Sequence, residues 1–329
     1  MQLSITVEGQ EGLTWPRWKR LAAEVERLGY AGLFRSDHFP GNRSALELVV
    51  SLAYLADSTE RIHFGSLVAP VSFRDPAMLA RQAAALDDLS GGRLVLGLGA
   101  GWEAHEHQVW GYQLGDAATR SARFEEGLEV ITRLLRNDEP VTYEGEYFQL
   151  REARLLPRPQ RPDGPSILIG GNGRRRTLPL AARYADVWNV FHLTPGAFQS
   201  RSEELDEFLQ QEGRRPEDVK RTIMLMVFCG QDEAELKRRA AYAYRMWAPE
   251  LSDQPFPRLI EALGSIFSPL LFNVGATFCP VVGSPERVVE QLNVYAEAGV
   301  EEMIIQWWDV EDVEGLEAYS EQILPHLVL

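Results

Sequence analysis

Residues 91–102 read GGRLVLGLGAGW, and the rest of the chain is organised around this stretch. Its apolar run, residues 93–98, is bounded by glycines, which is typical of a strand buried on both faces of a parallel sheet. Gly97, Gly99 and Gly101 follow at alternate positions, where the missing Cβ permits close backbone approach and positive φ. Because α/β proteins hold ligands at the carboxyl ends of parallel strands, the stretch predicts a binding turn. A tight strand-to-helix turn without a ligand is the alternative.

The glycine spacing excludes two nucleotide-binding motifs. A Rossmann fingerprint needs G-x-G-x-x-G, whereas this sequence has G-x-G-x-G followed by Trp102. No Gly-Lys-Ser/Thr follows, so the turn is not a P-loop. The strand also comes after several strand–helix units, whereas a dinucleotide-binding fold carries its glycines in the first unit.

Strand and helix patterns alternate along the whole chain. Strands are predicted at residues 3–7, 31–34, 62–68, 93–98, 166–169, 187–190, 221–229 and 303–307. Helices are predicted at residues 15–29, 45–56 (capped by Ser44), 76–89 (with Pro76 in its first turn), 121–135, 175–184, 198–212, 232–246, 284–298 and 316–327. This pattern predicts an α/β fold, a (β/α)8 TIM barrel forming one domain over residues 1–329.

Two segments do not fit a minimal barrel. Residues 102–147 are polar and aromatic, and residues 247–280 are rich in Pro and Phe, with at least one helix expected near residues 258–267. Residues 140–156 alternate around a turn and predict a hairpin outside the main sheet. Long extra segments in compact folds are often lids or binding loops.

Composition narrows the class of protein. The formal net charge of −15 argues against nucleic-acid binding. The two cysteines, Cys229 and Cys279, indicate neither a zinc site nor a disulfide framework. The sequence shows no signal-peptide pattern and no apolar run of membrane-spanning length, so we expect a cytoplasmic protein without a membrane partner.

The end of the second predicted strand carries the strongest catalytic pair, Asp37 and His38. A histidine at a barrel mouth can donate or accept a proton near neutral pH. Asp37 points to the opposite side if the strand continues, and we expect it to support the loop or a ligand hydroxyl. A loop-ordering Asp beside a surface His is the alternative.

A second glycine loop, GGNGRRRT at residues 170–177, opens a helix. Free backbone N–H groups and the helix dipole suit an anion there, and the arginines reinforce this. Cofactor binding is therefore expected at Gly170, Gly171, Asn172 and Arg174. The alternative is a plain strand–helix turn with solvated arginines.

Two other motifs favour simpler interpretations. His105-Glu106-His107 is not H-E-x-x-H, and its two histidines face different sides of a helix, so no metal site is expected. Trp307-Trp308 indicates one core and one rim position rather than a stacking platform.

The chain resembles the luciferase-like monooxygenase superfamily and, within it, the branch of oxidoreductases that depend on the deazaflavin coenzyme F420. The resemblance rests on FRSDHF (34–39), residues 64–102, RFEEGLEVI (123–131) and residues 167–189, with a weaker match at 281–300. It implies a bacterial luciferase-like barrel with insertions that is usually dimeric, with the helices at residues 45–56 and 76–89 as candidate interface. Members of the superfamily use either FMN or F420.

The resemblance also implies roles for individual residues. A non-prolyl cis peptide at Ser66-Leu67 would bulge against the central ring of the cofactor, and Asp37 and His38 would hold the cofactor or act in acid–base chemistry. Trp102 and His105 stand where some family dehydrogenases have a glutamate and an asparagine, so a sugar-phosphate dehydrogenase activity is not carried over. The turn after the fourth predicted strand would line the cofactor through Gly99, Ala100, Gly101 and Trp102.

The resemblance implies an oxidoreductase that transfers a hydride between F420 and a small organic substrate, and His38 is the expected proton partner. The substrate pocket is expected between residues 102–118 and 247–279. One alternative is an FMN-dependent two-component monooxygenase supplied by a separate reductase. Another is a non-catalytic flavin-binding barrel. A metal-dependent hydrolase would need paired ligands at several strand ends, and only Asp37-His38 offers such a pair.

Overall fold

Parallel strands close into a barrel in the computed structural model, which describes residues 1–273 and 276–328. Among these residues, eight strands follow one another around the ring, and a β3–β5 pairing closes it. In chain order they are β1 (Gln2–Val7), β2 (Gly32–Arg35), β3 (His63–Ser66), β5 (Leu94–Gly99), β8 (Ser166–Gly170), β9 (Val187–Phe191), β10 (Lys220–Leu225) and β13 (Glu302–Gln306). The predicted (β/α)8 barrel is confirmed.

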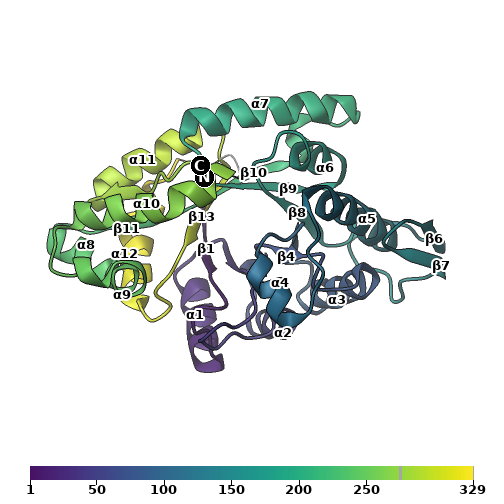
Figure 1. Cartoon of the computed structure of the whole chain (residues 1–329), viewed down its shortest axis with the longest axis horizontal. Helices are drawn as coiled ribbons and strands as arrows, with labels where there is room; N and C mark the ends of the chain where they lie inside the picture. Colours follow the sequence, from purple (N-terminus) through teal and green to yellow (C-terminus); the bar gives the residue numbers. More distant parts are fainter. Residues whose placement is uncertain (274–275, 329) are drawn as a thin grey trace.

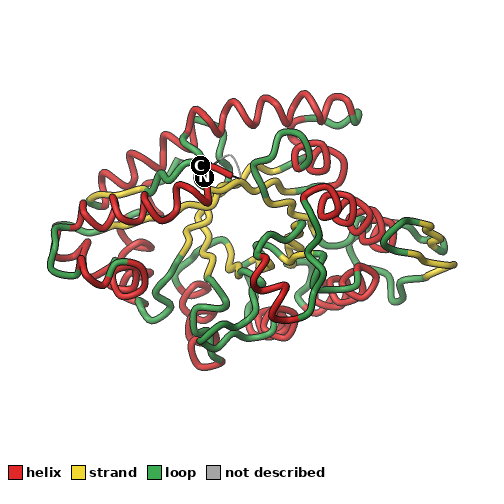
Figure 2. The backbone as a smooth tube through the Cα atoms, in the orientation of Figure 1, coloured by secondary structure: helices red, strands yellow, loops and turns green. Residues whose placement is uncertain are grey.

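Helices surround this ring of strands (Figures 1 and 2). They are α1 (Trp15–Arg27), α2 (Leu48–Ser58), α3 (Pro76–Leu89), α4 (Ala104–Trp110), α5 (Ala117–Arg136), α6 (Thr177–Tyr184), α7 (Pro195–Gln211), α8 (Glu233–Arg239), α9 (Ala241–Trp247), α10 (Phe256–Asn273), α11 (Pro285–Glu297) and α12 (Val313–Gln322). In α1 the buried residues Trp18, Leu21, Ala22 and Val25 form the stripe that packs on the barrel. No helix in the described part of the chain is long and apolar enough to cross a membrane.

The start of α2 differs from the prediction. The helix begins at Leu48 rather than at residue 45, and its cap is Glu47 rather than Ser44. The Glu47 carboxylate accepts a hydrogen bond from the Val50 amide at 2.8 Å and forms an ion pair with Arg74. A long-range partner therefore holds the cap in place, and sequence spacing alone could not show this.

The strand predicted at residues 221–229 is two strands in two sheets. β10 stays in the barrel, whereas β11 (Val227–Cys229) pairs with β12 (Val281–Gly283) in a separate parallel pair. Likewise the strand predicted at residues 62–68 ends at Ser66, and β4 (Ala69–Pro70) resumes the pairing with β5. An apolar run shows that a segment is buried but not which neighbour it pairs with.

The two expected insertions contain more regular structure than predicted. The first, residues 102–147, holds α4, all of α5 and β6 (Val141–Glu144), and β6 pairs with β7 (Gln149–Ala153) in the predicted hairpin. In the second, α10 is an 18-residue helix, and the helix predicted at residues 232–246 is broken into α8 and α9. Helices α8 to α10 lie at the opposite end of the molecule from the hairpin (Figure 1).

Apolar residues of the second insertion pack with those of β11 and α9 in a cluster separate from the main core. Its fully buried members are Met226, Phe228, Ala240, Ala243, Tyr244, Ala248, Phe256, Leu259 and Leu263. Trp308, which follows β13, packs against this cluster, whereas Trp307 belongs to the main core. The core-and-rim interpretation of the two tryptophans is therefore confirmed.

Candidate active site

The segment after β3 turns inward against two neighbouring strands. Its cis peptide bond joins Leu67 and Val68, one residue later than the expected Ser66-Leu67 position. The Val68 side chain lies where a Cβ on Gly99 or Gly170 would be, at 2.6 and 3.0 Å from those hypothetical atoms. The glycines at the ends of β5 and β8 are thus needed to admit Val68. The Ser66 hydroxyl donates to the Gly97 carbonyl at 2.7 Å and fixes the start of this bulge.

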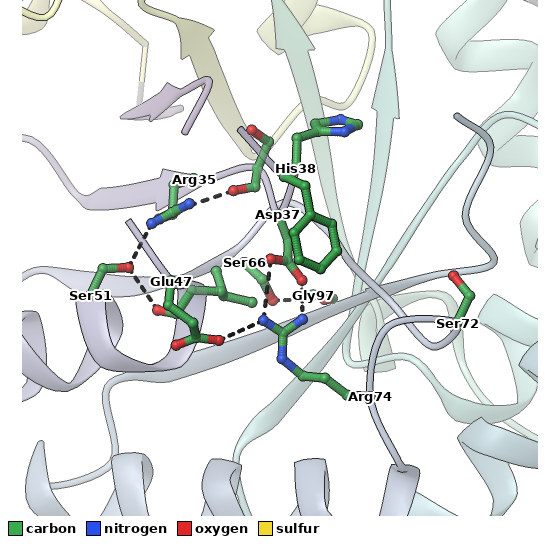
Figure 3. A network of polar contacts seen from close by, with 12 residues as sticks. Arg35, Asp37, His38, Glu47, Ser51, Ser66, Ser72, Arg74 and Gly97 are labelled. Atoms are coloured by element: carbon green, nitrogen blue, oxygen red, sulfur yellow. Dashed lines mark hydrogen bonds and ion pairs between the residues drawn. The ribbon is translucent and has the colours of Figure 1, made fainter. Parts of the chain in front are cut away.

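Asp37 is buried and belongs to an ion-pair network that reaches the surface at Glu47 (Figure 3). Its carboxylate accepts two hydrogen bonds from Arg74, which also pairs with Glu47 at 2.7 Å. Burial raises the pKa of Asp37, while the charge and hydrogen bonds of Arg74 act in the opposite direction. The structure therefore gives Asp37 the loop-ordering position that the sequence allowed. The sequence did not single out Arg74, because it follows β4 at a point with no recognisable motif.

The same network contains a fully buried arginine that the sequence did not reveal. Arg35 is 0% exposed, and its guanidinium donates to the Ser51 hydroxyl at 2.9 Å and to the Ser36 carbonyl at 3.1 Å. Burial lowers its pKa to about 10, against the upward effect of Asp37 and Glu47. The network ties β2 to α2, and it fixes the strand end that carries His38.

His38 points away from this network (Figure 3) and pairs with a carboxylate 68 residues later. Its Nδ1 lies 2.9 Å from Glu106 Oε2, and the other Glu106 oxygen accepts a hydrogen bond from the Phe39 amide. The Glu106 side chain is 8% exposed and that of His38 is 21% exposed. This contact fixes the orientation of the imidazole and leaves Nε2 as the nitrogen for proton exchange.

The surroundings of His38 favour its charged form. Burial by itself lowers the pKa of His38, but the hydrogen bond of Glu106 and the charges of Glu8, Glu106 and Asp37 raise it above its usual value. The Trp102 ring lies edge-on to the imidazole at a centroid distance of 5.9 Å and is 59% exposed. His38 and Trp102 are therefore brought together at the barrel mouth, as the sequence predicted.

The three side chains of the motif His105-Glu106-His107 have different surroundings. His105 is exposed, Glu106 binds His38, and His107 contacts the Ser72 hydroxyl and the Glu103 carbonyl at 2.8 and 2.7 Å. The prediction that the two histidines face different sides of a helix is confirmed. His105 is not brought to His38, and its expected contact with a cofactor stays a prediction. The motif does contain the carboxylate that contacts His38, and no sequence spacing predicts this long-range contact.

The glycine loop after β8 is partly committed to the fold. The Asn172 amide both donates to and accepts from the Phe191 backbone, at 2.9 and 3.2 Å, and Arg174 pairs with Glu204 at 2.8 Å while remaining exposed. The backbone N–H groups of Gly173 and Arg174 have no acceptor among the described residues. Those amides, next to the N-terminus of α6, fit an anionic cofactor group better than the Asn172 side chain does. The expected contacts of Gly171, Gly101, Ala100 and Leu67 with a cofactor stay predictions.

A further polar pair crosses the mouth from β1 to β13. Gln306 donates from Nε2 to Glu8 Oε1 at 2.7 Å, and Glu8 is among the charges that raise the pKa of His38. At the end of β9, His192 is 3% exposed, and burial lowers its pKa to about 4 against a smaller upward effect of Gln306. His192 is therefore neutral near pH 7. No sequence motif marks His192 or Gln306.

Together these groups fit a planar redox cofactor. Val68 offers an apolar side chain at the ends of β5 and β8, His38 and Trp102 contact each other after β2 and β5, and the Gly173 and Arg174 amides in the turn before α6 suit a phosphate. What the arrangement provides chemically is an imidazole held in one orientation for proton transfer.

Comparisons with known proteins agree with this geometry. A family model described as luciferase-like monooxygenase matches residues 3–302. The chain is 28% identical over 320 residues to the F420-dependent glucose-6-phosphate dehydrogenase of Amycolatopsis mediterranei (strain U-32), covering 93% of this chain and 92% of that protein.

Solved structures share the fold over the whole chain. One is an F420-dependent secondary alcohol dehydrogenase in complex with an F420–acetone adduct (TM-score 0.78, 20% identity, all of both chains covered). Another is the oxygenating constituent of 3,6-diketocamphane monooxygenase from Pseudomonas putida in complex with FMN (TM-score 0.75, 20% identity, all of both chains covered). At this identity the likeness shows the fold, and it includes proteins with either cofactor.

Proposed function

The chain belongs to the luciferase-like monooxygenase family, and from this premise we propose that it is an oxidoreductase that transfers a hydride between F420 and a small organic substrate. The observation that carries the proposal is the Glu106–His38 pair at the barrel mouth, with Nδ1 and Oε2 2.9 Å apart. Hydride transfer to or from an alcohol or carbonyl carbon requires a proton to move at the neighbouring oxygen. A fixed imidazole suits that task.

The residues divide the work as follows. Glu106 holds His38 in one orientation, so Nε2 takes the proton of a substrate hydroxyl or returns it to a carbonyl oxygen. Val68 supports the ring system from the barrel side, and the amides of Gly173 and Arg174 bind its anionic part. When bound, F420 supplies the hydride acceptor or donor. The chain itself holds the cofactor and the substrate in the orientation needed for hydride transfer, and it transfers the proton through His38.

An FMN-dependent monooxygenase is the second candidate, because a neighbour with FMN shares the fold. F420 is favoured by the placement of His38, which serves a paired hydride and proton transfer, and by relatives named as F420-dependent dehydrogenases over 93% of the chain. In the FMN case a separate reductase would be the partner. A non-catalytic flavin-binding barrel would have no use for a buried carboxylate that orients a histidine.

The test is cofactor binding by the purified protein, titrated separately with F420 and FMN and followed by fluorescence. Saturable F420 binding with much weaker FMN binding supports the proposal, and the opposite preference moves the protein to the flavin monooxygenases. His38→Ala should retain F420 binding and lose turnover. Unchanged turnover in this variant would refute the role of His38, and binding of neither cofactor would refute the proposal as a whole.

We also propose a homodimer in the cytoplasm that uses the faces of α2 and α3. Three apolar residues are exposed there, with Val50 at 56%, Met78 at 50% and Leu89 at 54%. The two helices pack side by side, so these side chains belong to adjacent surfaces. Exposed apolar residues that gather on one face are typical of an interface.

A further inference from the structure

Trp102, a large aromatic residue after β5, contacts the proton-transfer histidine, and the proposed function gives it no task. Its ring lies edge-on to the His38 imidazole, with the ring centroids 5.9 Å apart and the ring planes at 81°. Despite this contact, 59% of Trp102 is exposed. A large indole that remains exposed beside a reacting group offers apolar surface to a molecule that binds there.

A second exposed indole lies next to the residue that follows His38. Trp110, the last residue of α4, is 47% exposed and stacks on Phe39 at a centroid distance of 4.6 Å. The Phe39 amide donates to Glu106, which also contacts His38. The proton-transfer pair is therefore bordered by aromatic surface at Trp102 and at the Phe39–Trp110 stack.

Three carboxylates act on His38. Glu106 contacts its Nδ1, and the charges of Glu8 and Asp37 help to raise its pKa. Arg74, which could have offered a positive charge here, is already paired with Asp37. An anionic group next to the reacting carbon would approach these carboxylates at a cost, whereas a hydrocarbon group would gain apolar contact with the indole.

We propose that Trp102 selects the substrate by packing against apolar groups attached to the carbon that exchanges the hydride. The inference rests on the proposed function for the hydride and proton transfers, and it adds the substrate class, a secondary alcohol or ketone whose reacting carbon is flanked by hydrocarbon. The contact of Trp102 with His38 carries the inference. A substrate oxygen within hydrogen-bonding distance of the imidazole, about 2.8 Å, has its carbon and the groups on that carbon within reach of the indole.

The first experiment compares three ketones of nearly equal size that differ in one terminal group. Butanone carries a methyl group where hydroxyacetone carries a hydroxyl, and pyruvate has a carboxylate on the carbonyl carbon. In each reduction the carbonyl carbon takes the hydride of reduced F420 and the oxygen takes the proton of His38, and the F420 absorbance reports turnover. We expect kcat/KM for butanone to exceed that for hydroxyacetone at least about tenfold, and pyruvate to be the poorest substrate.

The variant Trp102→Ala separates a substrate contact from a cofactor contact. Loss of a substrate contact raises KM for butanone and lowers the butanone-to-hydroxyacetone ratio of kcat/KM about fourfold, the value of one buried methyl group. Loss of a cofactor contact lowers the turnover of both ketones alike and leaves this ratio unchanged. Trp102→Phe should keep more of the preference than Trp102→Ala.

The matched control for these variants is Trp15→Ala. Trp15 is also exposed, at 37%, and lies edge-on to a ring, that of Tyr54, at a centroid distance of 6.1 Å. It lies at the start of α1 and has no part in the proposed site. Trp15→Ala should therefore change neither the ratio nor KM.

The second experiment detects the contact without turnover. The protein is labelled with 5-fluorotryptophan, and the fluorine NMR signal that is missing in Trp102→Phe belongs to Trp102, one of the eight tryptophans. We expect butanone to shift this signal and pyruvate at equal concentration to leave it unmoved. The measurement is made with and without F420.

The outcomes separate the inference from the proposed function. A shift of the Trp102 signal by butanone, together with a ratio that falls in Trp102→Ala, supports the inference. It is overturned if the ratio is unchanged in Trp102→Ala or if butanone does not shift the signal. A shift by butanone without F420-dependent turnover refutes the proposed function and leaves the Trp102 contact in place, whereas equal F420-dependent turnover of all three ketones keeps the proposed function and refutes the inference.

Discussion

The contact between Glu106 and His38 gives the sharpest prediction. Glu106 accepts two hydrogen bonds, from His38 Nδ1 and from the Phe39 amide, and a glutamine in its place has only one oxygen. In Glu106→Gln either the Phe39 amide loses its acceptor or the amide NH2 group faces Nδ1. In the second case the imidazole proton is driven to Nε2.

The size of the effect follows from the lost contact. A hydrogen bond to a charged group contributes about 1.5–3 kcal/mol, and each 1.36 kcal/mol in the barrier is tenfold in rate. We therefore expect kcat to fall about 10- to 150-fold, with F420 affinity little changed because the hydrogen-bond contacts of the Glu106 side chain are to His38 and Phe39 and not to Val68 or to the Gly173 and Arg174 amides.

The pH profile provides a second readout. Glu106 is among the groups that raise the pKa of His38, whereas burial lowers it, so the variant should have a lower His38 pKa. If His38 acts as the base, the rising acid limb of kcat moves to lower pH. If it acts as the acid, the falling limb moves to lower pH as well. The shift therefore has the same direction whichever way the hydride moves.

The assay is F420-coupled turnover across the pH range, with thermal unfolding and F420 titration as checks on folding. Glu103→Gln is the matched control, because its side chain caps the same helix through the His105 amide at 3.0 Å and lies outside the proton-transfer pair. An unaltered kcat and pH profile in folded Glu106→Gln would refute the reasoning, and so would an equal loss in Glu103→Gln.

Three further predictions concern the barrel and its assembly. Glu302 is 3% exposed, and although burial favours its neutral form, its histidine and lysine partners lower its pKa to about 2. The contribution of ionised Glu302 to stability is therefore complete above its ordinary pKa near 4.5 and is lost as the pH falls toward 2. Glu302→Gln should lower the free energy of unfolding, measured in urea at pH 7, by about 3 kcal/mol. An unchanged urea midpoint would contradict this. Gly99→Ala should destabilise the protein by about 1–3 kcal/mol, because the added methyl group overpacks against Val68. Adding Val68→Ala to this variant should recover part of the lost stability in thermal unfolding. If the stability losses of the two substitutions simply add, the two residues are not in contact. Met78→Asp should shift the protein from dimer to monomer in sedimentation velocity without loss of helical circular dichroism, and a dimer that persists would remove α3 from the interface.

The sequence by itself determined the architecture. Regular alternation of apolar strands and amphipathic helices is local information, because each element must bury its own face. For that reason the number and order of the barrel strands, the helix starting at Pro76 and the hairpin of β6 and β7 agree with the prediction, although two of the strands end earlier than expected. The sequence also placed Asp37, His38 and Trp102 at strand ends, and strand ends of a parallel barrel meet at one mouth.

Only the tertiary structure decided which groups act together. Glu106 reaches His38 across 68 residues and Arg74 reaches Asp37 across 37, and nothing in the spacing of either residue reports such a contact. The same limit explains why residues 221–229 divide between two sheets and why Glu47 rather than Ser44 caps α2. Periodicity records whether a side chain is buried, whereas its partner depends on how distant segments pack. The barrel therefore follows from local pattern, and the site follows from contacts that form when the barrel closes.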